Sequence, residues 1–501
     1  MKSLLSIFIV LFCLTSLAQI PDPGFGTDGK VYQSFGSFHA ELTASCLQYN
    51  GKIFSVGNHG LLPNRVIISR HNQDGSPDTG FGDGGIKELV FGSTTGYAYT
   101  CLQATNSSLF VAGTSDGKAA MHFLNPDGSY NVSFGSGGKL LIDFGAGNGA
   151  RIDKLLTYPN GTLLGIGSAY NGNDWDFMVV RVYPGGELDP TFGSGGKVLI
   201  NVGGYNDFAL DGDFQSDGSI VLSGHSNNAS GLSQFSAIRL TPHGNIDASF
   251  GNNGKWILSI GNNYNNIEGL AIQPDDKIVL GGYLDNDMIT FRLNADGTTD
   301  NGFQGTGYVI TDFNGLAERA FDIEVQGDGK ILTAGWITTE FGTNQYAICR
   351  LTSQGFPDNS FDGDGKLIIE MGEGGSWINQ ILMQYDNKLL LCGLAVPALG
   401  GFSQFSLLQL TDLTLSDRIP ERLDQQPLIY PNPAESIINI SETDYGSKYK
   451  SIQVFELSGR LILEKPFSGY SLNIGMLSSG AYKLKIFTED QNVITTGFIR
   501  K

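Results

Sequence analysis

The sequence predicts an all-β protein built from a repeated four-stranded sheet, and three observations support this. A motif written Phe134-Gly135-Ser136-Gly137-Gly138-Lys139 in one copy recurs, with variations, at intervals of 53 to 58 residues. Asp-Gly or Asn-Gly turns, the strongest short-range hairpin signal, separate two apolar runs in most units. Glycine supplies 69 of the 501 residues and charged residues only 16%, which favours short strands and tight turns. The motif's phenylalanines are Phe25, Phe81, Phe134, Phe192, Phe250, Phe303 and Phe361.

Each unit contains signals for four strands in a fixed order. The first two strands flank the Asp-Gly turn, as in Ile323–Gly335, and the third runs into a polar turn, as in Ala237–Gly244. The motif then leads into a fourth strand such as Lys197–Ile200. The apolar runs show little alternation, for instance Ile278–Leu280, which indicates a sheet buried on both faces.

A doubly covered four-stranded sheet repeated at constant spacing is typical of a β-propeller blade. The last hairpin signal, Met383–Gly393, is followed by a third strand near Phe405–Leu410 but by no motif. The missing turn and fourth strand stand at the other end of the chain, at Pro21–Val31. We therefore expect a seven-bladed β-propeller over residues 19–411, closed by the N-terminal strand, because such closure removes exposed sheet edges.

These repeats resemble the delta-60 repeat family across about residues 19 to 411. The resemblance rests on Asp-Gly-Lys hairpins such as Asp328-Gly329-Lys330 and on turns such as Asp247-Ala248-Ser249-Phe250-Gly251-Asn252-Asn253-Gly254-Lys255. It implies the repeat architecture and carries no activity or ligand with it. The Gly-His and Trp-Asp pair of WD40 blades and the Asp-box of sialidase blades are absent from the unit.

The N-terminus has the pattern of a cleaved secretory signal peptide, residues 1–18. Lys2 precedes the apolar run Leu4–Leu14, and Ser16-Leu17-Ala18 supplies small residues for the peptidase. A lipid-anchored alternative would use Cys13, but the bulky Phe12 before it fits that pattern poorly. The rest of the chain has no run of eighteen apolar residues, so we expect no transmembrane segment.

Past residue 411 the repeat stops. Residues 412–428 are expected to be a linker, and residues 429–501 a small β-sandwich with regularly spaced turns. This last part resembles the C-terminal type A sorting domain of the type IX secretion system of Bacteroidota. The resemblance implies export by the type IX machinery, removal of the domain by its sortase, and then release or attachment to lipopolysaccharide. The matching residues are Pro431, Asn432, Pro433, Gly459, Gly480, Tyr482, Arg500 and Lys501.

Charge and motif content exclude several classes of function. The net charge of −19 makes nucleic acid an unlikely partner, because phosphate backbones require clustered Lys and Arg. We find no nucleophile elbow and no phosphate-binding loop, so we expect no cofactor and no catalytic residue. The six histidines lack metal-ligand spacing and are expected on the surface or in turns: His39, His59, His71, His122, His225 and His243.

Four cysteines remain in the exported chain, namely Cys46, Cys101, Cys349 and Cys392. An even number in a secreted protein makes disulfides possible. Four in such a long chain are not a disulfide framework, however, and Cys46 and Cys101 fall at the same place in adjacent buried strands. We therefore favour buried thiols.

An aspartate precedes the Phe of most motif copies by three residues. Such carboxylates could bind Ca²⁺, and Asp358, Asp362 and Asp364 are dense enough to suggest it. Alternatively, each Asp accepts backbone N–H bonds within its own turn. Because nearly every unit has one, we favour the structural interpretation and expect no metal. The residues are Asp22, Asp78, Asp189, Asp247, Asp300 and Asp358.

The connections divide between two faces of the propeller. The first–second and third–fourth connections share one face, the turn face, and are monotonous. The second–third and fourth–first connections share the other, the variable face, and differ between units, which is where binding residues concentrate. The variable stretches are Ala169–Asp176, His225–Gln234, Thr338–Gln345, Ala395–Ser403, Gly203–Asp207, Gly261–Asn266 and Gly372–Trp377.

The variable face carries aromatic residues among Asn, Gly and Asp, a composition suited to binding a glycan or a cell-surface protein. Equally, these rings could plug the ends of blade interfaces. The candidates are Tyr170, Trp175, Tyr205, Tyr264, Phe341 and Trp377.

We accordingly expect a secreted or surface-attached, non-enzymatic binding protein. The alternative is an enzyme acting on extracellular polysaccharide, with Asp174, Asp176 or Asp207 as acid and base. A third possibility is an adhesin in which the repeats are only a rigid spacer.

Overall fold

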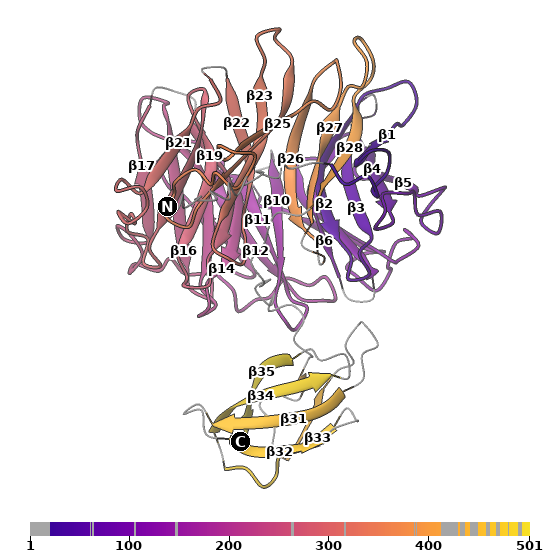
Figure 1. Ribbon diagram of the computed structural model, residues 1–501. Coiled ribbons are helices and arrows are strands. Elements are labelled where there is room, and N and C mark those ends of the chain that lie inside the picture. The colour runs from indigo at the N-terminus through magenta and orange to yellow at the C-terminus, as the bar shows by residue number, and fades with distance from the viewer. Residues whose placement is uncertain are drawn as a thin grey trace, which may run out of the picture. The chain divides into compact units, whose positions relative to one another are not determined.

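The computed structural model shows an all-β protein, with no α-helix in the part of the chain it describes (Figure 1). The strands fall into two compact units, β1 to β28 and β29 to β35. The expected signal peptide (1–18) and linker (412–428) lie outside the described residues. The described residues are 21–60, 62, 65–104, 107–145, 149–261, 265–314, 317–384, 386, 388–411, 429–430, 436–440, 449–456, 461–466, 471–478, 480–488 and 493–500.

Between residues 21 and 411 the described strands form seven four-stranded sheets in which neighbouring strands are antiparallel, as the repeat predicts. The first strands are β2 (Ala40–Leu47), β6 (Gly96–Gln103), β10 (Ala150–Thr157), β14 (Asp207–Phe214), β18 (Asn265–Ile272), β22 (Glu318–Val325) and β26 (Ser376–Met383). The second strands are β3 (Ile53–His59), β7 (Leu109–Ser115), β11 (Leu163–Tyr170), β15 (Ile220–Asn227), β19 (Ile278–Leu284), β23 (Ile331–Thr338) and β27 (Leu389–Ala395).

The outer half of each sheet contains the strands that flank the motif. The third strands are β4 (Arg65–His71), β8 (Lys118–Leu124), β12 (Trp175–Val182), β16 (Ser233–Leu240), β20 (Asp287–Leu293), β24 (Asn344–Leu351) and β28 (Gln404–Leu410). The fourth strands are β5 (Ile86–Val90), β9 (Lys139–Ile142), β13 (Lys197–Ile200), β17 (Lys255–Leu258), β21 (Tyr308–Thr311), β25 (Lys366–Ile369) and β1 (Lys30–Gln33).

The strand β1 takes the fourth position in the sheet of β26, β27 and β28. It pairs antiparallel with β28, with Lys30 opposite Leu408 and Gln33 opposite Phe405. The first and last strands of the first unit therefore lie in one sheet, and β28 has a partner on both sides.

Apolar side chains fill the space between neighbouring sheets. One core, for example, combines Phe54 and Ile68 from the sheet of β2 with Val111 and Ala120 from the sheet of β6. The strand β3 is buried at all its residues. Packing on both faces is the reason why the sequence of these strands does not alternate.

A β-bulge interrupts each first strand. In β10 the pairing with β11 shifts between Ile152 and Lys154, so that Asp153 is the extra residue. Arg151 and Asp153 remain partly exposed, whereas Ala150 before them and Ile152 between them are buried. The partly exposed side is the one on which the first strands face one another, because Lys154 pairs there with Asp211 of β14 at 2.7 Å.

An arginine on the third strand connects most sheets to the next. Arg181 Nε donates to Asp189 Oδ2 at 2.7 Å, its guanidinium lies 4.5 Å from the centroid of the Phe192 ring, and its Nη1 donates to the Pro242 carbonyl at 2.6 Å. Pro242 belongs to the turn of the following sheet. We call this Arg, Asp and Phe group the arginine tie. Its members are Arg70–Asp78–Phe81, Arg181–Asp189–Phe192, Arg239–Asp247–Phe250, Arg292–Asp300–Phe303 and Arg350–Asp358–Phe361.

The motif phenylalanine fills the gap between two sheets. The Phe192 ring lies against Gly244 in the next sheet's turn, where a Cβ built on the glycine would meet the ring at 2.9 Å. Gly244 has φ +82°, so this position excludes other residues both by space and by conformation. The N–H of Gly193, directly after Phe192, donates to the His243 carbonyl at 3.0 Å.

The motif lysine also reaches across a sheet boundary. Lys255 Nζ donates to the Asn201 carbonyl at 2.7 Å, and Lys197 and Lys366 make the same bond to Asp143 and Asp312. The two partners are 54 residues apart each time. The lysine is therefore a second tie, from the start of a fourth strand to the end of the preceding sheet's fourth strand.

The second unit consists of two small sheets around one core. Its strands are β29 (Ile429–Tyr430), β30 (Ile437–Ile440), β31 (Tyr449–Glu456), β32 (Leu461–Pro466), β33 (Ser471–Asn473), β34 (Gly480–Thr488) and β35 (Val493–Arg500). The sheet orders are β29-β30-β33 and β32-β31-β34-β35. Both sheets contribute to the core, with Ile438 and Leu472 from one and Ile452 and Leu484 from the other.

We predict that substituting the turn Asp of an arginine tie lowers the free energy of unfolding far more than substituting the corresponding turn residue in a sheet without the tie. Asp189→Ala removes one partner of an ion pair whose side chains are 11% and 7% exposed, and should lower the free energy of unfolding by about 3 kcal/mol. Asn131→Ala is the control, because the third strand of its sheet has Phe123 instead of Arg at the corresponding position. Guanidinium unfolding of the two variants measures the difference, and equal losses would contradict a role for the guanidinium.

Candidate functional site

The two tryptophans predicted to bind on the variable face have different surroundings. Trp175 is half-buried and lies 5.7 Å, ring to ring, from Phe208 of the next sheet. A Cβ on Gly149 would meet the Trp175 ring at 2.5 Å. Tyr170 approaches it edge-on at 6.3 Å. Trp175 thus fills an interface between sheets, which is the alternative to ligand binding that the sequence analysis gave for these aromatic residues.

Trp377 instead lines a hollow of about 340 Å³ on the variable face. Glu41 and Tyr97 lie in the same hollow, which brings together residues of β2, β6 and β26. The hollow offers a large ring, a phenol and a carboxylate to one ligand. Its lining residues are His39, Ala40, Glu41, Asn58, His59, Gly60, Tyr97, Trp377, Leu394 and Ser403.

The remaining predicted aromatics do not join this hollow. Tyr205 and Phe341 are 47% and 85% exposed and lie in the connections between strands. Tyr264 lies outside the described residues. Among the described candidates, therefore, only Trp377 lines the hollow.

The sequence analysis missed a group of charged residues on the first strands. They occupy the bulge position and the position two residues before it, and we call these two positions in all seven first strands the inner ring. The inner ring consists of Glu41, Thr43, Tyr97, Tyr99, Arg151, Asp153, Phe208, Leu210, Asn266, Glu268, Arg319, Phe321, Trp377 and Asn379.

Arg151 and Asp153 form an unusual ion pair within the inner ring. Arg151 Nε lies 3.1 Å from Asp153 Oδ2, but both atoms are buried and neither makes a hydrogen bond within the described structure. The Arg151 guanidinium lies 5.3 Å and 5.6 Å from the rings of Tyr99 and Phe208. Unsatisfied buried polar atoms of this kind are rare, and they are found where a water or ligand completes the site.

A series of contacts leads from Arg151, through the Phe208 ring, to the carboxylate of Glu268. The ring of Phe208 lies 5.2 Å from that of His225, whose Nδ1 is 2.7 Å from Asn266 Oδ1. Asn266 Nδ2 in turn donates to Glu268 Oε1 at 2.7 Å. Arg319 lies 4.6 Å from the Tyr283 ring nearby. The inner ring thus presents two guanidinium groups and the three carboxylates of Glu41, Asp153 and Glu268 among aromatic rings.

Burial weakens the acidity of these carboxylates. Desolvation raises the pKa of Glu268 to about 7, against the effect of the Asn266 hydrogen bond, and the Asp153 charge adds to the rise. Desolvation likewise raises the pKa of Asp153 to about 6 although Arg151 opposes it. Deeper along the first strands, burial raises the pKa of Asp322 to about 7, while Lys154 counteracts it. These acids change charge near neutral pH.

The turn aspartates cap their own turns, as predicted. Asp358 Oδ1 accepts the backbone N–H and the hydroxyl of Ser360 at 3.1 Å and 2.8 Å, and its Oδ2 pairs with Arg350 at 2.7 Å and Lys330 at 3.1 Å. Both oxygens of the carboxylate are therefore engaged by the protein's own donors.

The prediction for the histidines was wrong at three positions. His59, His71 and His122 are buried, the last with no exposed surface. The third-strand position that holds the tie arginine in other sheets is Phe123 here, and the ring of the adjacent His122 stacks on Phe91 at 4.0 Å. Burial lowers the pKa of His122 to about 3, so it is neutral at physiological pH. A buried strand position can accommodate a neutral imidazole, which the sequence analysis did not consider.

All four cysteines beyond residue 20 are free thiols, in agreement with the favoured expectation. Cys101, Cys349 and Cys392 are buried, and Cys46 is partly exposed. Burial raises the pKa of Cys392 to about 12, which keeps that thiol protonated.

The three acids considered for catalysis accept hydrogen bonds from nearby residues of the chain. Asn171 Nδ2 donates to Asp174 Oδ1 at 2.5 Å and to Asp176 Oδ2 at 2.8 Å. Asp207 is fully buried and accepts the Val202 N–H at 2.6 Å. Burial raises the pKa of Asp207 to about 6. None of the three lines the hollow around Trp377.

Comparison with protein-family models identifies both units. A model described as a secretion system C-terminal sorting domain matches residues 428–500. A model described as a β-propeller domain of unknown function (DUF5122) matches residues 159–192, 215–250, 273–303 and 326–361. The chain is a repeat β-propeller protein with a type IX sorting domain. This sorting domain directs export to the cell surface or beyond. Of its predicted signal residues, Pro431, Asn432, Pro433, Gly459 and Lys501 lie outside the described residues.

Gly480, Tyr482 and Arg500 of the sorting domain lie in β34 and β35. The side chain of Tyr482 is buried in the core, and its hydroxyl donates to the Ser478 carbonyl at 2.8 Å. Gly480 pairs with Arg500 at the edge of the sheet. These three residues therefore help to build the domain.

Several solved structures resemble the propeller protein at low identity. Virginiamycin B lyase from Staphylococcus aureus has 13% identity and a TM-score of 0.45, covering 76% of this chain and 98% of that one. PorZ, a surface component of the type IX secretion system of Porphyromonas gingivalis, has 10% identity and a TM-score of 0.34, covering 93% and 59%. A protein of unknown function from Dyadobacter fermentans has 14% identity and a TM-score of 0.38, covering 78% and 99%. At this level of similarity nothing about activity follows for this chain.

No curated protein sequence matches the propeller protein. In the described part of the chain, no helix has the length and apolar character that crossing a membrane requires.

The raised pKa of Glu268 predicts a pH dependence of stability. Its pKa is about 7 in the folded protein against 4.5 for the unperturbed group. The charged carboxylate therefore destabilises the fold above pH 7, and this effect disappears as the pH falls toward 4.5. Glu268→Gln should raise the melting temperature above pH 7 by about 2 °C and leave it unchanged near pH 4.5.

The control for this measurement is Glu187→Gln, an exposed glutamate on the turn face, which should shift the melting temperature at no pH. Calorimetric scans across this pH range test the prediction. Parallel curves for wild type and Glu268→Gln would show that Glu268 titrates normally.

Proposed function

We propose that this secreted β-propeller is a non-enzymatic binding protein whose ligand occupies the variable face over the inner ring. The observation that carries the proposal is the partly exposed pair Arg151 and Asp153, whose Nε and Oδ2 atoms are buried, 3.1 Å apart and without a hydrogen bond within the described structure. The cost of leaving such atoms without partners is recovered when a ligand supplies them.

The chemistry of the inner ring favours a polar ligand with several hydroxyl or charged groups. Trp377 and Tyr97 offer ring surfaces in the hollow, and Glu41 offers an acceptor beside them. Arg151 and Arg319 offer donors in a fixed planar fork. A surface glycan presents apolar sugar faces and hydroxyl groups together, so it matches this set. A cell-surface protein is the second candidate, supported by the exposed Phe341 in the same face's loops.

We further infer that the seven sheets form one closed ring, completed by β1. Two features support this inference. The strand β1 pairs with β28 over Lys30–Gln33, and β2 lies beside β26 as it lies beside β6. At the boundary between β2 and β26, the Ser45 N–H donates to Gln380 Oε1 at 2.6 Å. A closed ring holds the inner-ring residues in fixed positions around one site.

The enzyme alternative has less support. A glycosidase requires two carboxylates flanking a bound sugar, one of them free to act on water or the anomeric carbon. Asp176 of β12 and Asp207 of β14 are buried and accept hydrogen bonds from Asn171 and Val202. We therefore place binding, without bond cleavage, as the function.

After export we propose that the type IX sortase removes the sorting domain and leaves the propeller as the functional part. The propeller is then either released or attached to lipopolysaccharide, and both fates expose the variable face to extracellular ligands.

Trp377→Ala should weaken ligand binding at least about tenfold, because the substitution removes the largest ring surface in the hollow. Phe356→Ala is the control: Phe356 is 54% exposed on the turn face and should not affect binding. A glycan array and a pull-down from cell surfaces, with the secreted wild-type protein, first identify the ligand. Titration of the variants then measures the effect.

Near-ultraviolet circular dichroism shows whether Trp377→Ala retains the native fold. Equal binding by wild type and Trp377→Ala would exclude the hollow as the site. Release of sugar products from the array ligand by the wild-type protein would instead favour the enzyme alternative.

A further inference from the structure

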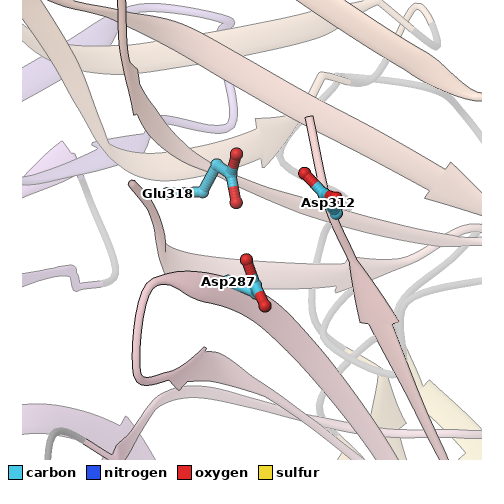
Figure 2. A group of neighbouring side chains, drawn as sticks. All are labelled: Asp287, Asp312 and Glu318. Carbon is cyan, nitrogen blue, oxygen red and sulfur yellow. The ribbon is translucent and has the colours of Figure 1, made fainter. Parts of the chain in front are cut away.

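Three carboxylates meet at the boundary between two neighbouring sheets, a place that we call a crevice, and none of the three belongs to the hollow or the inner ring. They belong to Asp287 at the start of β20, Asp312 directly after β21, and Glu318 at the start of β22. One oxygen of each lies within 4.8 Å of the other two (Figure 2). Figure 2 shows the three side chains converging from separate segments of the chain. The sequence analysis did not single out any of the three.

Glu318 gives this cluster a second, independent feature. Its side chain is fully buried, its Oε1 accepts the Phe313 N–H at 3.2 Å, and its Oε2 has no hydrogen-bond partner in the described structure. A buried carboxylate oxygen without a donor is costly unless a cation or a proton compensates it. Asp287 is half-buried and Asp312 exposed, so the crevice is open to solvent on one side.

The same crevice occurs between the other sheets, and the strand register identifies the corresponding residues. Between the sheets of β6 and β10 the three positions hold Lys118, Asp143 and Ala150, and Lys118 Nζ pairs with Asp143 Oδ2 at 3.0 Å. A lysine ammonium thus neutralises the carboxylate there. The remaining sets are Arg65, Val90 and Gly96; Asp176, Asn201 and Asp207; Gln234, Ser259 and Asn265; Gln345, Glu370 and Ser376; and Gln404, Ser34 and Ala40.

Only the crevice at Glu318 holds three carboxylates, and no lysine or arginine stands in its register positions. The neighbouring cation is Lys366, but its Nζ donates to the Asp312 backbone carbonyl. Burial raises the pKa of Glu318 to about 7, and the charges of Asp287 and Asp312 add to the rise. The three acids therefore repel one another in a partly desolvated place.

We propose that Asp287, Asp312 and Glu318 bind one Ca²⁺ ion, which joins the sheet of β18–β21 to that of β22–β25. Oxygen ligands alone, with three negative charges and no histidine or cysteine, suit a hard divalent cation. Ca²⁺ tolerates irregular geometry with water completing its shell, whereas Mg²⁺ demands a near-ideal octahedron. The ion takes the place that the Lys118 ammonium has between β8 and β9. Extracellular Ca²⁺ sites have dissociation constants of about 10⁻⁴ to 10⁻³ M.

Calorimetric titration of CaCl₂ into the metal-stripped secreted protein tests the proposal. We expect one site with a dissociation constant in that range, and a higher melting temperature with Ca²⁺ than with a chelator. Asp312→Asn should weaken binding at least about tenfold while leaving the fold intact, because Asp312 is exposed. Glu318→Gln should abolish the Ca²⁺-dependent rise in melting temperature.

Asp143→Asn is the matched control, since it changes the same position in the crevice that already has a lysine. It should leave Ca²⁺ binding unchanged. No binding by wild type, or equal weakening by Asp143→Asn and Asp312→Asn, would overturn the proposal. Equal affinity for MgCl₂ would overturn the assignment to Ca²⁺. A rise in melting temperature for Glu318→Gln without any Ca²⁺ binding would show that a shared proton, and not a cation, compensates the cluster.

Discussion

A guanidinium shared between neighbouring sheets is the interaction on which the rest of this propeller depends. Arg181 pairs with the turn Asp189, covers the ring of Phe192 and donates to the Pro242 carbonyl in the next sheet. One side chain thus fixes a third strand, the turn after it and the neighbouring sheet. Five of the described sheets contain the Arg, Asp and Phe group, and in four of them the arginine also donates to a carbonyl of the next sheet. The motif lysine adds a second tie at a constant separation of 54 residues. Such fixed spacing keeps the angle between sheets constant, which a ring of repeated sheets requires.

The turn aspartates and the inner ring differ in how fully their polar atoms are satisfied. Asp358, for example, makes four contacts with donors of Ser360, Arg350 and Lys330. Buried polar atoms without partners in the described structure include Arg151 Nε, Asp153 Oδ2 and Glu318 Oε2. Buried groups of this kind mark places where a ligand or an ion completes the structure.

Much of the architecture could be predicted from local pattern alone. The Asp-x-x-Phe spacing predicted the turn cap, because that cap depends on residues close in sequence. The tie arginine was visible as well, always eight residues before the Asp, but was not recognised.

The inner ring was missed for a physical reason: the bulge adds one residue to each first strand, so alternation does not reveal which side chains face their counterparts. Asp287, Asp312 and Glu318 come together only through strand register, across two sheets. The histidines were misjudged because polar character was equated with exposure, whereas His122 is fully buried.

Hydrogen exchange of the secreted protein, followed by mass spectrometry, tests the closed ring most directly. The peptide that contains Lys30–Gln33 should exchange as slowly as the peptides of β13 and β25, because β1 pairs with β28 as those fourth strands pair with their third strands. Exchange of that peptide at the rate of unpaired chain, with β13 and β25 protected, would contradict closure by the N-terminal strand and with it the fixed inner ring.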